Sequence, residues 1–402
     1  MSDHPKMQLS EKWITDPQTL RRITAVREQV VAGEDSNKII NSLRKELAAD
    51  RATFVFAQAE LQIRARKKFS RADSMLFTRL GLEQATSEPI ARFKRNCLEN
   101  IEFVLDICCG IGGDAIGFAD VCRLSVVDQD ETTLAYAKHN LQVYGASVGG
   151  GVTALAQSFS DTTLPPDAFV HIDPDRRTSG GTGRTVRAEN FSPDLDTILR
   201  RLNPEQAACI KLAPATTLET LIGRPYQRHW IGHQRECKQQ LLWLSPEMES
   251  QAANRITVID GQGDVANLEI AEVHQRRIVS PIGQYIHEPH AAILAADLVD
   301  SVAKRFELGR LSVGSVYLTG DAIEPSKFLA SFRLIEQCSI KAKKIKAVLK
   351  AHDIGIVEWK NRGVDAEVVA KIKKIRPDGS RNGTVILTRL GKQFVSLICE
   401  RV

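Results

Sequence analysis

The stretch Phe103-Val-Leu-Asp-Ile-Cys-Cys-Gly-Ile-Gly-Gly-Asp114 constrains the fold of this chain more than any other part of the sequence. Its first five residues are apolar except for Asp106, which predicts a buried strand with one acid near its end. Glycines 110, 112 and 113 then predict a tight turn into an apolar helix over 115–119. Glycine suits such a turn because it reaches positive φ without strain and lets a ligand approach the backbone closely. A strand, a glycine turn and a helix N-terminus together form a nucleotide-type binding corner.

The spacing of this corner, D-x-x-x-G-x-G, differs from the G-x-G-x-x-G fingerprint of dinucleotide sites. Asp106 precedes the glycines, where it suits a ligand with a cationic amino-acid moiety. We interpret that ligand as S-adenosylmethionine (SAM), because the stretch resembles the first motif of the Rossmann-like methyltransferases. An ordinary βαβ unit with a glycine-rich turn is the alternative.

A second acid supports the SAM interpretation. The segment 123–128 reads as a short strand that ends in Asp128, 22 residues after position 106 (128 − 106). This separation is close to the roughly 20 residues expected for a carboxylate that binds ribose hydroxyls. The predicted cofactor-binding residues are Asp106, Cys108, Gly110, Gly112, Asp128 and Gln129, with Ser158 and Phe159 after the third strand, where the adenine usually lies.

Strand and helix patterns alternate from residue 98 to about 280, which favours a mainly parallel sheet with helices between its strands. The expected strands are 103–107, 123–128, 151–156, 168–173, 207–213, 228–233, 239–244 and 255–260, with helices over 131–144 and 195–202. Right-handed crossovers bring the carboxyl ends of the first, second and fourth strands to one edge, where open α/β sheets bind their ligands.

Two different regions flank this predicted sheet. Residues 1–97 have a helical period throughout, with helices ending near Asp50 and spanning 52–66. The basic cluster Arg66–Arg71 within it is a solvated helix face, a surface for phosphate backbones or a lid over the cofactor. Residues 281–402 read as a separate α+β module, with helices over 291–306 and 340–350 and strands over 315–318, 354–359, 384–388 and 394–399.

The densest positive charge of the chain lies in this last module. The helix 340–350 carries lysines over most of its surface, and Lys371, Lys373, Lys374 and Arg376 follow it. Most such runs are soluble faces, but clustered cations in a small strand-rich domain also form an electrostatic footprint for a polyanion. The pattern therefore predicts contact with RNA or DNA.

The segment His171-Ile-Asp-Pro-Asp-Arg-Arg-Thr178 follows the fourth strand, where amino-methyltransferases carry (D/N/S)-P-P-(Y/F/W/R). A carboxylate and a backbone carbonyl there accept the N–H bonds of the acceptor nitrogen and hold its lone pair toward the methyl group. The predicted catalytic residues are Asp173, Pro174 and Arg176, although Asp175 replaces the second proline. The alternative is a polar strand end with Asp173 capping a turn. Lys211 is a weaker candidate on the same sheet edge.

Composition sets broad limits on the class of protein. A chain of 402 residues with 43% hydrophobic and 26% charged residues is typical of a soluble globular protein with two or three domains. Its eight cysteines form no C-x-x-C pair, so no zinc ribbon is indicated and no metal site is predicted. Without an apolar signal core or a membrane-length apolar run, a cytoplasmic location is expected.

Taken together, the chain resembles a bacterial family of Rossmann-like methyltransferases with a C-terminal THUMP-like domain. The similar segments are 77–86, 106–114, Asp173-Pro-Asp-Arg-Arg177 and Trp359-Lys-Asn-Arg-Gly-Val364. The cofactor half is also similar to trimethylguanosine synthases over 110–113 and 137–145, but Arg176 stands where those enzymes carry a cap-stacking tryptophan. The resemblance implies SAM as cofactor and structured RNA, a tRNA or rRNA, as partner.

The predicted fold class is therefore α/β, a seven-stranded methyltransferase sheet with a helical region before it and an α+β THUMP-like domain after it. The predicted domains are 1–97, 98–280 and 281–402. The hypothesis is a SAM-dependent methyltransferase of a base nitrogen in RNA. Its rivals are methylation of a protein or small molecule, and a non-catalytic RNA-binding protein that retains the fold.

Overall fold

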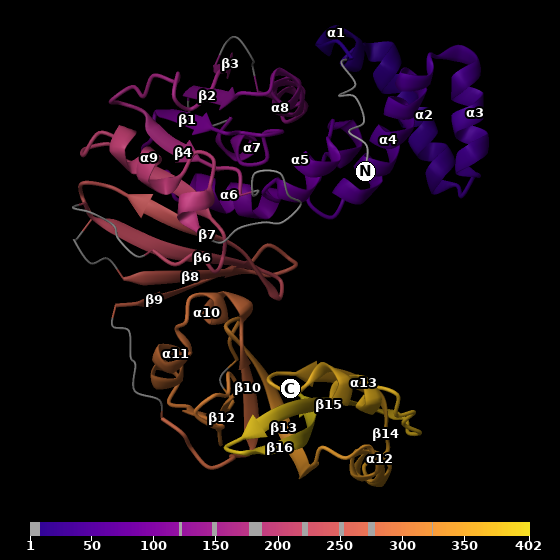
Figure 1. The fold of residues 1–402 in the computed structure, drawn as a ribbon, viewed down its shortest axis with the longest axis vertical. Coiled ribbons are helices and arrows are strands. Elements are labelled where there is room, and N and C mark those ends of the chain that lie inside the picture. The colour runs from indigo at the N-terminus through magenta and orange to yellow at the C-terminus, as the bar shows by residue number, and fades with distance from the viewer. Residues whose placement is uncertain are drawn as a thin grey trace. The chain divides into compact units, whose positions relative to one another are not determined.

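A computed structural model describes residues 9–119, 123–146, 151–176, 187–218, 224–248, 253–271, 278–323 and 325–402 (Figure 1). The chain divides into two compact units, residues 1–226 with 241–251 and residues 227–240 with 252–402. This division falls earlier than residue 280, where we expected a domain boundary, and the three predicted functional domains stay a prediction. Arg177 lies outside the described residues.

The described part of the N-terminal region is helical, as the apolar period predicted. Its helices are α1 (Glu11–Ile14), α2 (Pro17–Val31), α3 (Ser36–Glu46), α4 (Ala49–Ala65), the 3-10 turn η1 (Ala72–Ser74), α5 (Arg79–Gln84) and α6 (Glu88–Asn96). Local signals fix several ends: the Asp16 carboxylate accepts the backbone N–H of Gln18 at 2.8 Å, one residue beyond Pro17. The expected boundary near Asp50 is wrong, since α4 already begins at Ala49.

The first unit contains the predicted parallel sheet. Its strands are β1 (Phe103–Ile107), β2 (Arg123–Asp128), β3 (Val152–Ala156), β4 (Phe169–Ile172) and β5 (Ala208–Leu212), with helices α7 (Ala115–Phe118), α8 (Glu131–Val143), η2 (Ala188–Asn190) and α9 (Leu195–Arg201) between them. The strands lie in the order β3-β2-β1-β4-β5, and each neighbouring pair is parallel. Apolar residues from β1, β4, β5 and α9 form a shared buried core.

The sheet continues beyond β5 with β7 (Glu236–Leu244), β6 (Tyr226–His233), β8 (Asn254–Ile259) and β9 (Val265–Ile270). The strands β3-β2-β1-β4-β5-β7-β6 agree in number with the expected seven-stranded sheet, and β8 and β9 extend it to nine strands. Only Gln234 and Arg235 connect β6 to its neighbour β7, a connection that antiparallel strands allow. β9 was not predicted from the sequence.

The second sheet has the strand order β11-β12-β10-β13-β16-β15-β14. Its strands are β10 (Tyr285–Pro289), β11 (Gly309–Arg310), β12 (Leu318–Gly320), β13 (Leu329–Ser339), β14 (Ile354–Asn361), β15 (Arg381–Leu390) and β16 (Gln393–Arg401). Its helices are α10 (Ala291–Ala295), α11 (Val299–Arg305), α12 (Ala342–Ala351) and α13 (Ala366–Ile372). The apolar stripe of α12 packs into a core with β14, β15 and α13, which leaves its lysines on the outside.

Two expected elements of this module are wrong. The single helix over 291–306 is two helices, because Asp297 takes a left-handed φ of 55° and the N–H of Leu298 bonds back to the carbonyl of Ile293. The strand expected over 315–318 begins only at Leu318. Ser315 forms a turn instead, since its hydroxyl accepts the N–H of Tyr317 at 3.0 Å.

Candidate active site

One large cavity opens at the carboxyl edge of β1, β2 and β4, all within the first unit. Its volume is about 1060 Å³, enough for a drug-sized ligand. Ten of the predicted site residues line it: Asp106, Cys108, Gly110, Asp128, Gln129, Ser158, Phe159, Asp173, Pro174 and Arg176. Gly112 does not, and shapes the turn through its φ of 85°. The acids at the ends of three different strands therefore face the same space, as parallel strands require.

The first of these acids, Asp106, lies near the end of β1 and is almost fully buried. His171 of β4 sits opposite it in register, and the imidazole Nδ1 lies 2.7 Å from Asp106 Oδ1. The second oxygen, Oδ2, is buried and has no hydrogen-bond partner among the described residues. Burial raises the pKa of Asp106, against the opposing effect of His171. An unpaired buried oxygen at the cavity wall is suited to a donor from a bound ligand.

A hydrogen bond links the glycine turn to Asp128, the second of these acids. Gly110 has a φ of 55°, and a Cβ built on it would meet no atom within 4 Å, so its backbone faces open space. Its N–H donates to Asp128 Oδ2 at 3.0 Å, and the N–H of Asp130 donates to Asp128 Oδ1 at 3.0 Å. Burial raises the pKa of Asp128, against these two amide donors. The carboxylate is thus fixed in one orientation at the end of β2.

Cys108 occupies an unusual position in this turn. Its φ of 58° lies in the left-handed region, which costs a non-glycine residue of the order of 1 kcal/mol or more. Burial and the neighbouring Asp128 raise the pKa of its thiol well above the usual range, so the thiol stays protonated. Cys108 therefore contributes shape and a small apolar surface to the cavity, and no nucleophile.

The segment after β3 supplies a polar edge without an acid in the cavity. Gln157, Ser158 and Phe159 line the cavity, and the hydroxyl of Ser158 donates to Asp161 at 2.6 Å. Asp161 itself does not line the cavity. The ring of Phe159 is held by Arg201, whose guanidinium lies 4.8 Å from the ring centroid. This wall is therefore preformed.

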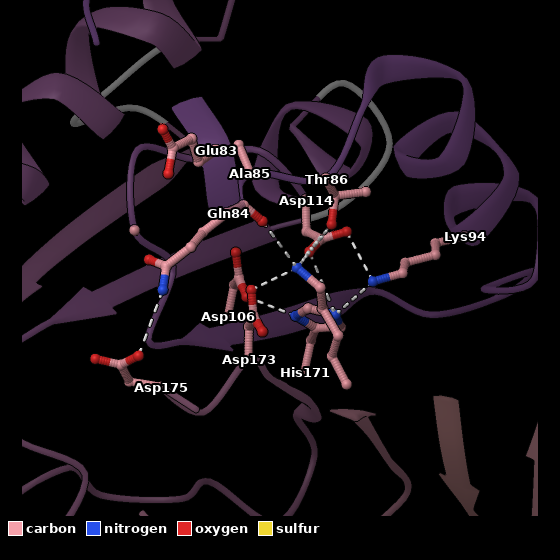
Figure 2. A network of polar contacts seen from close by, with 12 residues as sticks. Glu83, Gln84, Ala85, Thr86, Lys94, Asp106, Asp114, His171, Asp173 and Asp175 are labelled. Carbon is pink, nitrogen blue, oxygen red and sulfur yellow. Dashed lines mark hydrogen bonds and ion pairs between the residues drawn. The ribbon is translucent and has the colours of Figure 1, made fainter. Parts of the chain in front are cut away.

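Asp173 follows β4 directly and is partly exposed, unlike Asp106 and Asp114 of the same charged network (Figure 2). Its side chain is 24% exposed, and Oδ2 accepts a hydrogen bond from Lys211 Nζ at 2.6 Å. Lys211, on β5, has a side chain only 4% exposed. Lys211, the weaker candidate from the sequence, therefore contacts the predicted catalytic acid Asp173 directly. Asp175, two residues on, accepts from the Gln84 amide at 3.4 Å.

The network also includes Lys94, Asp114 and Thr86, to which the sequence analysis assigned no role in the site. Lys94 Nζ lies 2.8 Å from Asp114 Oδ1 and 3.2 Å from His171 Nε2. The Thr86 hydroxyl donates to Asp114 Oδ2 at 2.8 Å. A lysine ammonium has only donors, so His171 Nε2 accepts and its Nδ1 carries the proton donated to Asp106.

The charged groups of this network shift one another's pKa. Although burial by itself raises the pKa of Asp114, Lys94 and Lys211 hold it far below its usual range. Although burial by itself lowers the pKa of Lys94, Asp114 raises it above its usual value. Burying such groups costs desolvation energy that ion pairing rarely exceeds, so the network is weak evidence for stability and stronger evidence for a functional site.

Another part of the cavity wall comes from α5 and the residues after it. Thr78, Leu80, Gly81, Gln84 and Ala85 line the cavity. Lys68 fixes this wall, because its ammonium donates to the carbonyls of Leu82, Glu83 and Ala85 at 2.7, 3.1 and 2.9 Å. The basic cluster Arg66–Arg71 therefore includes a lysine whose hydrogen bonds stabilise one wall of the cavity.

A solved structure shares this fold over almost its whole length. The chain superimposes on the crystal structure of a protein of Porphyromonas gingivalis named as a methyltransferase, with a TM-score of 0.69, 18% identity and coverage of 96% of this chain and 99% of that one. The chain has the Rossmann-like methyltransferase fold. The fold class predicted from the sequence is confirmed.

Sequence comparisons agree with this methyltransferase fold. Residues 101–162 match the family described as RNA cap guanine-N2 methyltransferase, and residues 329–401 match the family described as THUMP domain-like. Proteins from two strains of Mycobacterium tuberculosis, both named as uncharacterised S-adenosylmethionine-dependent methyltransferases, are 28% identical over 362 residues, 88% of this chain and 97% of theirs. The predicted resemblance is confirmed. The prediction of SAM as the cofactor is also confirmed, since the names of both relatives give S-adenosylmethionine as their cofactor.

The described residues contain neither a candidate metal site nor a candidate membrane-spanning helix. No group of three or more His, Cys, Asp or Glu side chains is placed to hold a metal ion there. Among the helices that the structure describes, none is both long and apolar enough to cross a membrane.

Proposed function

We propose that this protein is a SAM-dependent methyltransferase that modifies a nitrogen of a base in structured RNA. The observation that supports the proposal best is the convergence of Asp106, Asp128 and Asp173, from the ends of three strands, on one cavity of the methyltransferase fold. An ordinary βαβ unit would not require acids at all three strand ends to face the same space.

The residues at the first two strand ends fit SAM. Asp106 Oδ2, buried and unpaired among the described residues, suits the ammonium of the methionine moiety. The open backbone at Gly110 lets the cofactor approach, and the fixed carboxylate of Asp128 suits the ribose hydroxyls. Gln129, Ser158 and Phe159 suit the adenosine half. When bound, SAM supplies an electrophilic methyl group on a sulfonium.

The acceptor would lie against Asp173 and Pro174. The Asp173 carboxylate and the Pro174 carbonyl each accept one N–H of the acceptor, so that the nitrogen lone pair points away from them. Since methyl transfer from a sulfonium is already favourable, this orientation carries most of the catalysis. Arg176, which lines the same cavity, can stack on a base or bind a phosphate with its planar guanidinium.

RNA is the proposed partner because of the charge on α12 and α13. Lys341, Lys343, Lys344, Lys346, Lys350, Lys371, Lys373, Lys374 and Arg376 are exposed, and within the described residues none of them forms an ion pair. They all fall in the part that matches the THUMP-like family, and the other matching family is described by an RNA substrate. A cytoplasmic location is proposed with this function.

The proposal is tested by incubating the protein with SAM labelled in its methyl group and total RNA, followed by mass spectrometry of the nucleosides. Wild type should give one methylated nucleoside, and Asp173→Asn should lose at least 100-fold in rate while calorimetry shows unchanged SAM affinity. Asp106→Asn should lose SAM affinity instead. Label found in protein or in a small molecule, with none in RNA, would refute the RNA substrate. SAM binding without transfer to any acceptor would indicate a non-catalytic protein.

A further inference from the structure

The buried lysine behind Asp173 takes no part in the function proposed above. Lys211 does not line the cavity in which the acceptor and the cofactor are proposed to bind. Its ammonium nevertheless lies 2.6 Å from Asp173 Oδ2, 3.8 Å from Asp114 Oδ2 and 3.5 Å from the carbonyl of Gln84. These acceptors belong to the loop after β4, the turn before α7 and the wall formed by α5.

Lys211 thus leaves the two oxygens of Asp173 with different roles. Oδ2 is taken by the ammonium, whereas Oδ1 has no partner among the described residues. Because Asp173 is partly exposed and lines the cavity, Oδ1 is the oxygen left for an acceptor N–H. A carboxylate held by one oxygen keeps a single orientation, whereas a free carboxylate rotates about its side-chain bonds.

The surroundings of the buried Lys211 include carboxylates on more than one element. Asp114 lies near Lys211 and is itself paired with Lys94, so the charges alternate from Lys94 through Asp114 and Lys211 to Asp173. Figure 2 labels Lys94, Asp114 and Asp173 of this series. On α6, Lys94 also contacts His171, which bonds to Asp106. The acid proposed for the cofactor and the acid proposed for the acceptor are therefore joined by one set of buried contacts.

We propose that Lys211 is a positioning residue for methyl transfer: it holds Asp173 by one oxygen and presents the other to the acceptor. This inference rests on the proposed function. It predicts that removing the ammonium reduces the rate of transfer and leaves both binding steps almost intact, because neither ligand touches Lys211.

The kinetic test compares wild type with Lys211→Met, Lys211→Arg and Lys211→Ala, with SAM and the RNA substrate. For Lys211→Met, kcat should fall about 100-fold, as expected for a misplaced catalytic group, while KM for RNA and Kd for SAM change less than threefold. Lys211→Arg should recover part of the loss, and added ethylammonium should rescue Lys211→Ala in a saturable way. Lys360→Met is the matched control, since Lys360 forms a mostly buried pair with Glu288 at 2.6 Å, and its kcat should not change.

A second test needs no turnover and detects the contact itself. In protein labelled with 15N at lysine Nζ, Lys211 should give a slowly exchanging ammonium resonance, assigned by its absence in Lys211→Arg. That resonance should shift or broaden in Asp173→Asn and stay unchanged in Glu236→Gln, which alters a carboxylate of an exposed lysine pair. An unchanged Lys211 resonance in Asp173→Asn, or a Lys211→Met enzyme with wild-type kcat, would overturn the proposal. An inactive wild type with the expected resonance shift would refute the proposed function alone.

Discussion

Two basic runs of this chain look alike in sequence and are used differently in the structure. In Arg66–Arg71 three of the four cations have contacts within the molecule: Arg66 donates two hydrogen bonds to Asp73 at 2.8 and 2.9 Å, Lys68 caps α5, and Arg71 lies 5.3 Å from the Tyr144 ring centroid. On α12 the lysines are exposed and form no ion pair among the described residues. The difference teaches that a basic run indicates a polyanion surface only where its charges remain unpaired.

The largest effect expected from this comparison is on stability. Lys68→Met should lower the free energy of unfolding by about 2 kcal/mol, because three carbonyls at the end of α5 lose a charged donor. Urea unfolding monitored by circular dichroism measures this. The neighbouring Lys67→Met is the control, and Lys67 is exposed, so its change should stay within about 0.5 kcal/mol. Equal losses in both variants would contradict the internal role of Lys68.

The next largest effect concerns the affinity for RNA, and it is expected from the α12 lysines, whereas the effect on stability is expected from Arg66–Arg71. Replacing Lys343, Lys344 and Lys346 together with Gln should weaken RNA binding about tenfold at low salt. The slope of log K against log salt should fall by about 2 to 3, since about one counterion is released for each phosphate contact. Fluorescence anisotropy over a salt series measures both quantities.

The matched control for this triple variant lies on α3. Replacing Lys38, Arg44 and Lys45 with Gln removes the same number of exposed charges from another helix. That variant should keep the wild-type salt slope. If both triple variants lose the same slope, net charge and not the α12 surface determines RNA binding.

A smaller effect is expected from the exposed pair of Arg66 and Asp73. Arg66→Gln should cost about 0.5 kcal/mol at neutral pH, as exposed ion pairs usually do. The hydrogen bonds from Arg66 lower the pKa of Asp73, so the pair's stabilisation is present above the ordinary value of 3.8 and is lost as pH falls through the lowered pKa. Unfolding measured from pH 2 to pH 7 should show a weaker acid dependence in the variant. An unchanged dependence would assign the effect to Arg27, which also faces Asp73.

The smallest effect is expected on α12 itself. Lys344→Gln should leave the free energy of unfolding within about 0.5 kcal/mol of wild type, because the side chain is exposed and unpaired among the described residues. Thermal and urea unfolding both measure it. A loss above 1 kcal/mol would show that this lysine, like Lys68, has an internal partner.

The elements predicted from the sequence were those whose signals are local. Strand 123–128 and helix 131–144 are found almost to the residue, since the apolar positions of a short strand and an N-cap such as Asp130 are each encoded within a few positions. The break at Asp297 was missed because an aspartate in the left-handed region leaves no apolar-period signal. β13 was missed because its exposed half, Arg333 to Ser339, lacks the apolar alternation of a strand.

The site shows the same division. Asp106, Asp128 and Asp173 were found because each stands at a strand end next to a recognisable turn. Lys94, Asp114 and Lys211 were missed or placed low because their meaning lies in contacts between residues far apart in the chain. A lysine in an amphipathic helix such as α6 reads as a solvated cation, whereas Lys94 is 1% exposed.

By itself, the sequence determined the glycine turn, the strand-end acids and the parallel sheet that gathers them, because each follows from local chemistry and from the handedness of crossovers. Only the tertiary structure decided which cations are buried beside carboxylates and which face solvent. The physical reason is that ionisation and pairing depend on desolvation and on distances of 3 to 4 Å, which packing sets and chain spacing does not.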